Sequence, residues 1–177
     1  MPIEHGQSRR SIRIPAFDYA QPGAYFITIC AYRRRRIFGH VEDEAVCLNW
    51  IGKIVREEWW RTEIIRETVI LDQFVVMPNH FHAIFHITNY KSNDLPVGAH
   101  CNAPLHRQPR SVGSLIALFK GSVTRRVRKD MQNPSFTIWQ RNYYERVIRD
   151  EFELNKFRAY ITSNPIRWEL ERYYPHG

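Results

Sequence analysis

Two histidines, His80 and His82, stand one residue apart in an apolar segment whose composition is typical of a β-strand. Side chains alternate between the two faces of a strand, so both imidazoles lie on one face, about 7 Å apart along the backbone. At that separation the two rings can bind the same metal ion. The opposite face carries Phe81, Ala83 and Phe85, which we expect in the core. Taken alone, the pair fits a structural role as well as it fits a metal site.

A tyrosine and an amide near the C-terminal end could complete such a site. Tyr160 and Asn164 are four residues apart in a segment predicted to form a helix over 150–164, so they share one face of it. If this helix covers the histidine face of the sheet, Asn164 supplies a third metal ligand and the Tyr160 hydroxyl lies beside the metal. In the alternative interpretation, Tyr160 packs on its own helix and Asn164 caps that helix before Pro165.

The rest of the chain predicts the elements that must position these groups. Apolar periodicity and turn residues predict strands over 24–32, 69–77, 80–88 and 136–140, and helices over 49–67, 111–130 and 150–164. The second and third strands are joined too closely for a parallel crossover, so they form an antiparallel hairpin. Residues 89–110 are polar and lack periodicity, which predicts a surface loop. The pattern predicts an α+β fold, an antiparallel sheet with helices packed on it.

Length and composition limit the class of protein. The chain has 177 residues, of which 44% are hydrophobic and 25% are charged, enough for one compact domain over 1–177 with a packed core. Its three cysteines are widely spaced and indicate neither a disulfide framework nor a zinc knuckle. No segment has the apolar length of a signal peptide or a membrane span. We therefore expect a cytoplasmic protein without a membrane partner.

The formal net charge is +8, and the basic residues are concentrated in two blocks, 33–36 and 107–149. Basic residues interleaved with aromatic ones favour single-stranded nucleic acid as a partner, because cations bind phosphates and exposed rings stack on bases. A solvated basic surface is the alternative, and a core role for Trp139 fits equally well. The candidate DNA contacts are Arg33, Arg34, Arg35, Arg36, Lys120, Arg125, Arg126, Trp139, Arg141, Tyr143 and Tyr144.

Several motifs occur together along the chain. PNHFH lies within VVMPNHFHAIFHI and is followed by FKGSVTRR, WQRNYYERVIRDE and YITSNP. In this order and at these separations, they resemble the REP-associated tyrosine transposases, which belong to the single-tyrosine HUH superfamily (His, hydrophobic, His). The resemblance extends from about residue 24 to residue 168. Each motif alone is weak, and their joint occurrence is specific.

The resemblance implies a ferredoxin-like α+β domain that nicks and rejoins single-stranded DNA through a 5′-phosphotyrosine intermediate. The implied substrates are extragenic palindromic hairpins. His80 and His82 match the HUH pair, with Phe81 as its hydrophobic residue. Tyr160 matches the nucleophile of the family, and Asn164 matches the third, polar metal ligand.

Other assignments stay open at this point. Mixed nitrogen and oxygen ligands suit Mg²⁺ or Mn²⁺ better than zinc, and the resemblance implies the same metals. Tyr143 and Tyr144 also lie in a family motif, and we prefer Tyr160 as nucleophile for its helical relation to Asn164.

The protein could act as a monomer or as a homodimer. The main alternative function is non-catalytic binding of single-stranded DNA or RNA, and an HUH replication initiator or relaxase fits less well with so short a chain.

Overall fold

The computed structural model describes residues 21–88 and 111–173, with side chains up to residue 168. The expected loop over 89–110 lies outside the described residues. The elements in chain order are β1 (Gly23–Cys30), the 3₁₀ turn η1 (Tyr32–Arg34), β2 (Gly39–Glu42), β3 (Ala45–Leu48), α1 (Trp50–Ile65), β4 (Val69–Met77), β5 (His80–Ile87), α2 (Val112–Asp130), β6 (Tyr144–Ile148) and α3 (Glu151–Tyr173). Within the described part of the chain, none of the helices has the apolar length that a bilayer crossing requires.

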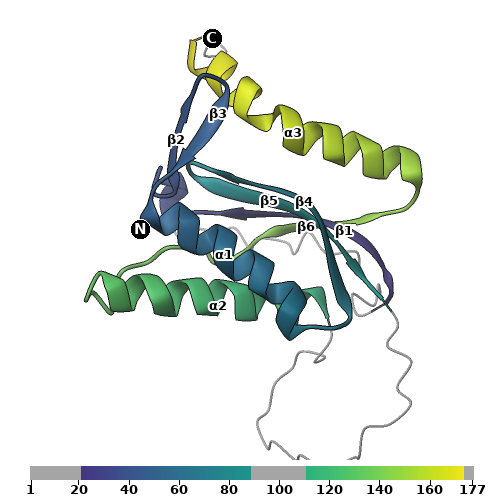
Figure 1. The fold of residues 1–177 in the computed structure, drawn as a ribbon, viewed down its shortest axis with the longest axis horizontal. Helices are drawn as coiled ribbons and strands as arrows, with labels where there is room; N and C mark the ends of the chain where they lie inside the picture. Colours follow the sequence, from purple (N-terminus) through teal and green to yellow (C-terminus); the bar gives the residue numbers. More distant parts are fainter. Residues whose placement is uncertain (1–20, 89–110, 174–177) are drawn as a thin grey trace, which may run out of the picture.

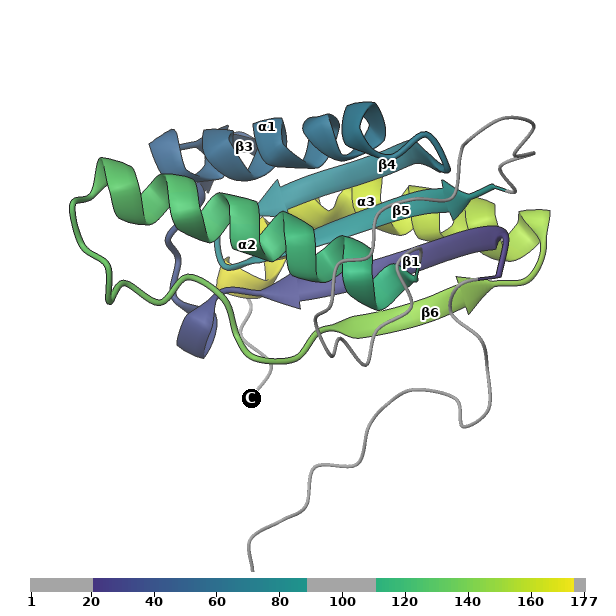
Figure 2. The ribbon, with the colours of Figure 1, turned by 90° about the horizontal axis from the view of Figure 1, so that it is seen from below.

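Four strands form one antiparallel sheet in the order β4-β5-β1-β6. Helices α1 and α2 cover one face of this sheet, and α3 alone covers the other, as Figures 1 and 2 show. A separate hairpin of β2 and β3 lies beside the C-terminal half of α3 (Figure 1). The predicted α+β fold, with helices packed on an antiparallel sheet, is confirmed.

The larger core lies between the sheet and the helices α1 and α2. As predicted, the odd-numbered residues of β5 point into it. Trp59 of α1 is fully buried, and its ring lies 5.1 Å from those of Phe81 and Phe119. Both helices begin at polar residues whose side chains satisfy free backbone amides: Asn49 accepts from the Gly52 N–H, and Ser111 accepts from the Ser114 N–H.

A smaller apolar cluster lies under α3. Its buried members are Phe26, Ile84, Ile148, Leu154 and Ile161. The Phe26 ring stacks on Phe157 of α3 with ring centroids 4.4 Å apart. The even-numbered face of β5 is therefore covered by α3, the arrangement that the candidate site requires.

The strand predicted over 136–140 is wrong. In that segment the structure has a single bridge, between Ala31 and Trp139, and the fourth strand of the sheet is β6, which pairs with β1. The aromatic and branched composition that suggested a strand is explained by burial, because Ile138 and Trp139 lie in the core. They anchor the connection from α2 to β6 without joining the ladder.

The predicted end of the last helix near Asn164 is also wrong, because α3 continues through Pro165 to Tyr173. Proline disfavours a helical conformation in the preceding residue but does not forbid it. The continuation contacts β2 and β3, a hairpin that the sequence analysis missed. Packing against this hairpin offsets the lost backbone hydrogen bond.

Candidate active site

Strand β5 presents His80 and His82 toward α3, with ring centroids 4.5 Å apart and planes inclined by 72°. Thr28 is the partner of His82 in the ladder between β1 and β5, and its Oγ1 lies 2.8 Å from His82 Nδ1. The Nδ1 of His80 donates to Asn79 Oδ1 at 2.6 Å. With both Nδ1 atoms engaged, each ring keeps its Nε2 for another partner.

Helix α3 brings the other two predicted residues to this pair. The Tyr160 hydroxyl lies 3.4 Å from His82 Nε2, and the two ring centroids are 5.1 Å apart. Asn164 is 7% exposed, and its side chain hydrogen-bonds to His80. The structure therefore brings all four predicted residues together, and the helix does cover the histidine face. Their chemical roles stay predictions.

Both imidazoles are neutral at neutral pH. Burial, together with the nearby positive charge of Arg34, lowers the pKa of His80 to about 4. Burial and the neighbouring His80 lower the pKa of His82 to about 3. Only a neutral imidazole offers a lone pair to a metal. Two neutral nitrogens and the amide oxygen of Asn164 are thus a donor set that fits a weakly held divalent cation.

These four side chains line a pocket of about 540 Å³ between the sheet and α3. Tyr143 and Tyr144 line the same pocket, although they lie outside α3. Sequence reasoning missed part of the lining: Thr28, Cys30, Asn79, Gln140, Asn142, Arg167 and Trp168. A signal existed for Arg167, which follows Tyr160 by about two helical turns and so shares its side of the helix. The incorrect helix end at Asn164 hid that signal.

The first basic block divides between the pocket and its surroundings. Arg34 lines the pocket, and the Arg36 guanidinium lies 5.4 Å from the centre of the Trp168 ring. Arg35 donates to the carbonyl of Thr137 at 2.8 Å.

Arg33 and Arg34 have φ values of 54° and 52°, the left-handed region that costs a non-glycine residue about 1 kcal/mol or more. From the other side of the pocket, the Arg167 guanidinium lies 5.7 Å from the centre of the Tyr160 ring.

The basic candidate DNA contacts of the second block do not line this pocket. Lys120, Arg125 and Arg141 line an open groove of about 910 Å³ between α2 and the segment 132–141. Arg126 is turned toward α1, where it forms ion pairs of 2.7 Å with Glu57 and 2.9 Å with Glu58.

Trp139, another candidate DNA contact, lies in the core. It is 7% exposed, donates from Nε1 to the Lys120 carbonyl at 3.2 Å and packs against Phe38 and Phe119. Its ring offers no open face for stacking on a base, whereas Tyr144 is 36% exposed.

The fold is that of a REP-associated tyrosine transposase. A solved structure of such a transposase, bound to a REP hairpin, superimposes with a TM-score of 0.59 at 18% sequence identity and covers 88% of this chain and 74% of that one. An uncharacterized protein from Haemophilus influenzae is 37% identical over 175 residues, spanning 94% of this chain and 93% of the relative. The chain belongs to the same family as that protein. No model of a known protein family matches the chain.

Proposed function

We propose that the protein nicks and rejoins single-stranded DNA, with Tyr160 as the nucleophile. The observation that carries this proposal is the 3.4 Å separation between the Tyr160 hydroxyl and His82 Nε2, in a pocket shared with His80 and Asn164. A phenol, two neutral imidazoles and an amide that converge in a basic pocket suit transesterification at a phosphate.

In the proposed step, the Tyr160 oxygen loses its proton to solvent and attacks the scissile phosphorus. The bond from phosphorus to the 3′ oxygen breaks, and that oxygen takes up a proton to leave a free 3′-hydroxyl. The 5′ end of the cut strand is then held as a phosphotyrosine. Because the phosphodiester energy is kept in this bond, attack by a 3′-hydroxyl reseals the strand without ATP.

The proposed cofactor is Mg²⁺ or Mn²⁺, held by His80, His82 and Asn164. A free phenol has a pKa near 10, so only about 0.1% is ionised at pH 7, and its target must be activated. A bound divalent cation would supply charge neutralisation and orientation at the phosphate. Asn79 and Thr28 hold the two rings so that their Nε2 atoms remain available. Arg34 and Arg167 add positive charge where a phosphate would enter.

The proposed substrate is a DNA hairpin of the REP type with a single-stranded flank. The transposase of similar fold was solved with a REP hairpin. In this chain the basic groove along α2 suits backbone phosphates, and Tyr143 and Tyr144 in the pocket suit stacking on unpaired bases.

The test is to mix the protein with labelled hairpin DNA and Mn²⁺ and to look for an adduct that survives SDS. We expect an adduct that Tyr160→Phe abolishes while DNA binding remains. Trypsin cleavage after Arg158 and Arg167 leaves Tyr160 as the only tyrosine in its peptide, 159–167, whereas Tyr143 and Tyr144 fall in 142–146. Mass spectrometry therefore identifies the nucleophile. Cleavage without an adduct would indicate hydrolysis by water, and binding without cleavage would favour the non-catalytic alternative.

A further inference from the structure

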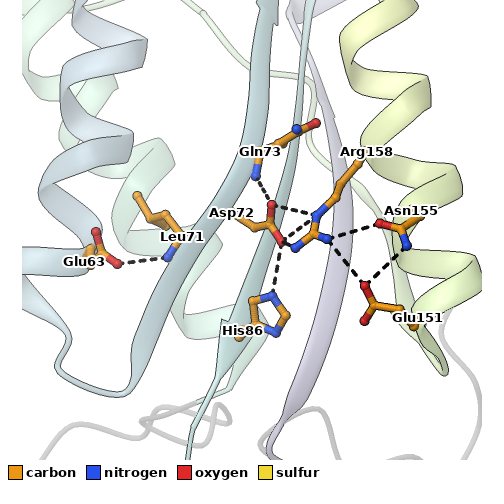
Figure 3. A network of polar contacts seen from close by, with 8 residues as sticks. All are labelled: Glu63, Leu71, Asp72, Gln73, His86, Glu151, Asn155 and Arg158. Atoms are coloured by element: carbon orange, nitrogen blue, oxygen red, sulfur yellow. Dashed lines mark hydrogen bonds and ion pairs between the residues drawn. The ribbon is translucent and has the colours of Figure 1, made fainter.

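A second polar cluster, which shares no residue with the lining of the pocket, ties α3 to the sheet (Figure 3). Arg158 of α3 donates from Nη2 to Asp72 Oδ2 at 2.7 Å and from Nε to both carboxylate oxygens at 3.2 Å. His86 Nε2 lies 3.3 Å from the same carboxylate. The Asp72 side chain is 12% exposed, so this ion pair is shielded from solvent on the carboxylate side.

Asp72 lies at an irregularity in β4. The register between β4 and β5 shifts between Leu71 and Phe74, a break in the ladder that re-aims side chains. The backbone N–H of Gln73 donates to Asp72 Oδ1 at 2.7 Å. Burial raises the pKa of Asp72, but hydrogen bonds from Arg158 and His86 outweigh it and hold the pKa below its ordinary value. With α3 in place, the carboxylate is therefore charged and held by groups from α3, β4 and β5.

Arg158 and Tyr160 flank the apolar stripe by which α3 contacts the sheet. At roughly 100° per residue, the two side chains are about 200° apart around the helix axis, and the buried Leu154 and Ile161 lie between them. Thr162 supports the Arg158 side by donating to Gln73 Oε1 at 3.3 Å. A rotation of the helix that freed Arg158 would also displace the Tyr160 hydroxyl.

The apolar cluster alone does not determine that rotation. Hydrophobic contacts are non-directional, and the cluster under α3 is much smaller than the core on the other face. A guanidinium that contacts both oxygens of a carboxylate is directional and fixes an orientation.

We propose that Asp72 and Arg158 are positioning residues, which set the rotation of α3 so that the Tyr160 hydroxyl faces His82. This inference rests on the proposed function for its effect on cleavage, and it has a structural readout that does not.

The experiment compares Asp72→Asn, Arg158→Gln and the double variant in full-length protein. At saturating hairpin DNA and Mn²⁺, each variant is expected to form the adduct 10 to 100 times more slowly, since a misplacement of about 1 Å can cost a hundredfold in rate. The Kd for DNA should change by less than about threefold, because neither residue of the pair lines the pocket. The double variant should lose no more than the worse single variant, because all three disrupt one contact.

Glu151→Gln is the matched control. It removes the carboxylate charge from the 3.7 Å ion pair of Arg158 with a residue of the same helix and leaves the contact with the sheet intact, so the rate should stay within about twofold of the unaltered protein. Arg158→Lys, which keeps the charge but loses the two-oxygen contact, should be slow like Arg158→Gln and serves if Asp72→Asn fails to fold.

Hydrogen exchange provides the readout without DNA. Amides of α3 should exchange faster in Asp72→Asn and Arg158→Gln, while those of β1 and β5 stay protected. Unchanged exchange in α3, a rate within twofold of the unaltered protein, or a loss that equals that of Glu151→Gln would overturn the inference. If the unaltered protein forms no adduct, the proposed function fails, and exchange in α3 still decides whether the pair orients the helix.

Discussion

The hydroxyl of Thr28 lies 2.8 Å from Nδ1 of His82, although the two residues are 54 positions apart. The antiparallel ladder between β1 and β5 sets them side by side. This contact engages the nitrogen that faces the sheet and leaves Nε2 toward Tyr160. Thr28, which has no proposed role in the reaction itself, thus helps to orient the imidazole of His82.

Thr28→Val should therefore weaken the use of metal while leaving the fold intact, because valine has nearly the same shape but no hydroxyl. Loss of a partner that orients a metal ligand costs about 10- to 100-fold in metal affinity. We expect a corresponding rise in the Mn²⁺ concentration that gives half-maximal adduct. Thr28→Ser keeps the hydroxyl and should resemble the unaltered protein. Equal Mn²⁺ requirements for Val and Ser would show that the contact does not matter.

His80→Ala and His82→Ala should abolish adduct formation but reduce DNA affinity by less than about threefold, because phosphate contacts to basic residues dominate affinity. Asn164→Ala should raise the Mn²⁺ requirement or remove activity. Gel shifts and the adduct assay measure the two effects separately. Normal cleavage by either histidine variant would show that the two histidines do not hold a required metal. If Asn164→Ala has the same Mn²⁺ requirement and activity as the unaltered protein, Asn164 has a structural role only.

The free energy of unfolding should fall as the pH is lowered from about 6.5. An unfolded chain binds a proton on each histidine near pH 6.5, whereas the folded protein resists protonation until about pH 4 at His80 and about pH 3 at His82. Between these limits the unfolded state holds more protons than the folded state. His80 and His82 therefore each lower the free energy of unfolding by about 1 kcal/mol for every unit by which the pH falls. Above pH 6.5 neither contributes.

Urea unfolding at several pH values measures this dependence. His82→Asn lacks one of the two groups, so its stability should fall less steeply below pH 6.5 than that of the unaltered protein. Parallel curves for the two proteins would contradict the assignment of a neutral, buried His82.

Arg34→Gln and Arg167→Gln should each weaken DNA binding and reduce the slope of log K against log salt by about 1, because each residue neutralises one phosphate. Arg61→Gln is the charge-matched control. Arg61 lies on α1, on the opposite face of the sheet, and pairs with Glu58. An identical loss of affinity in all three variants would mean that net charge, and not the pocket, governs binding.

Trp139→Ala should destabilise the protein by about 3 to 5 kcal/mol, the usual cost of deleting a large buried aromatic side chain. Its burial and its contacts with Phe38 and Phe119 carry this expectation. Thermal or urea unfolding provides the measurement. A loss of DNA affinity without a loss of stability would contradict this expectation and would indicate that Trp139 contacts DNA.

Local patterns predicted the parts of the fold that depend on local geometry. Alternation along β5 correctly assigned the faces of His82 and Phe85, and helical spacing placed Tyr160 beside Asn164. The hairpin of β4 and β5 followed from the short join at Pro78. In each case the periodicity of a strand or helix determines the outcome, and distant residues contribute little.

Other features depended on tertiary contacts that no local pattern records. Thr28 joins the site because of the register between β1 and β5, which spacing within either strand does not reveal. The segment around Ile138 resembles a strand in composition because it is buried, whereas β6 has two adjacent charged residues and still pairs with β1. The extension of α3 beyond Pro165 reflects packing against β2 and β3.

Pro165 has no backbone N–H, so the turn of α3 after Tyr160 lacks the hydrogen bond to the carbonyl of Ile161. The half of the helix that Arg158 attaches to the sheet is therefore joined to the half carrying Arg167 and Trp168 through a turn with one backbone hydrogen bond fewer, the kind of place where helices bend. Bending at this turn would shift the wall of the pocket that Arg167 and Trp168 form. Under the proposed function, such bending would let a DNA strand enter and leave without moving Tyr160.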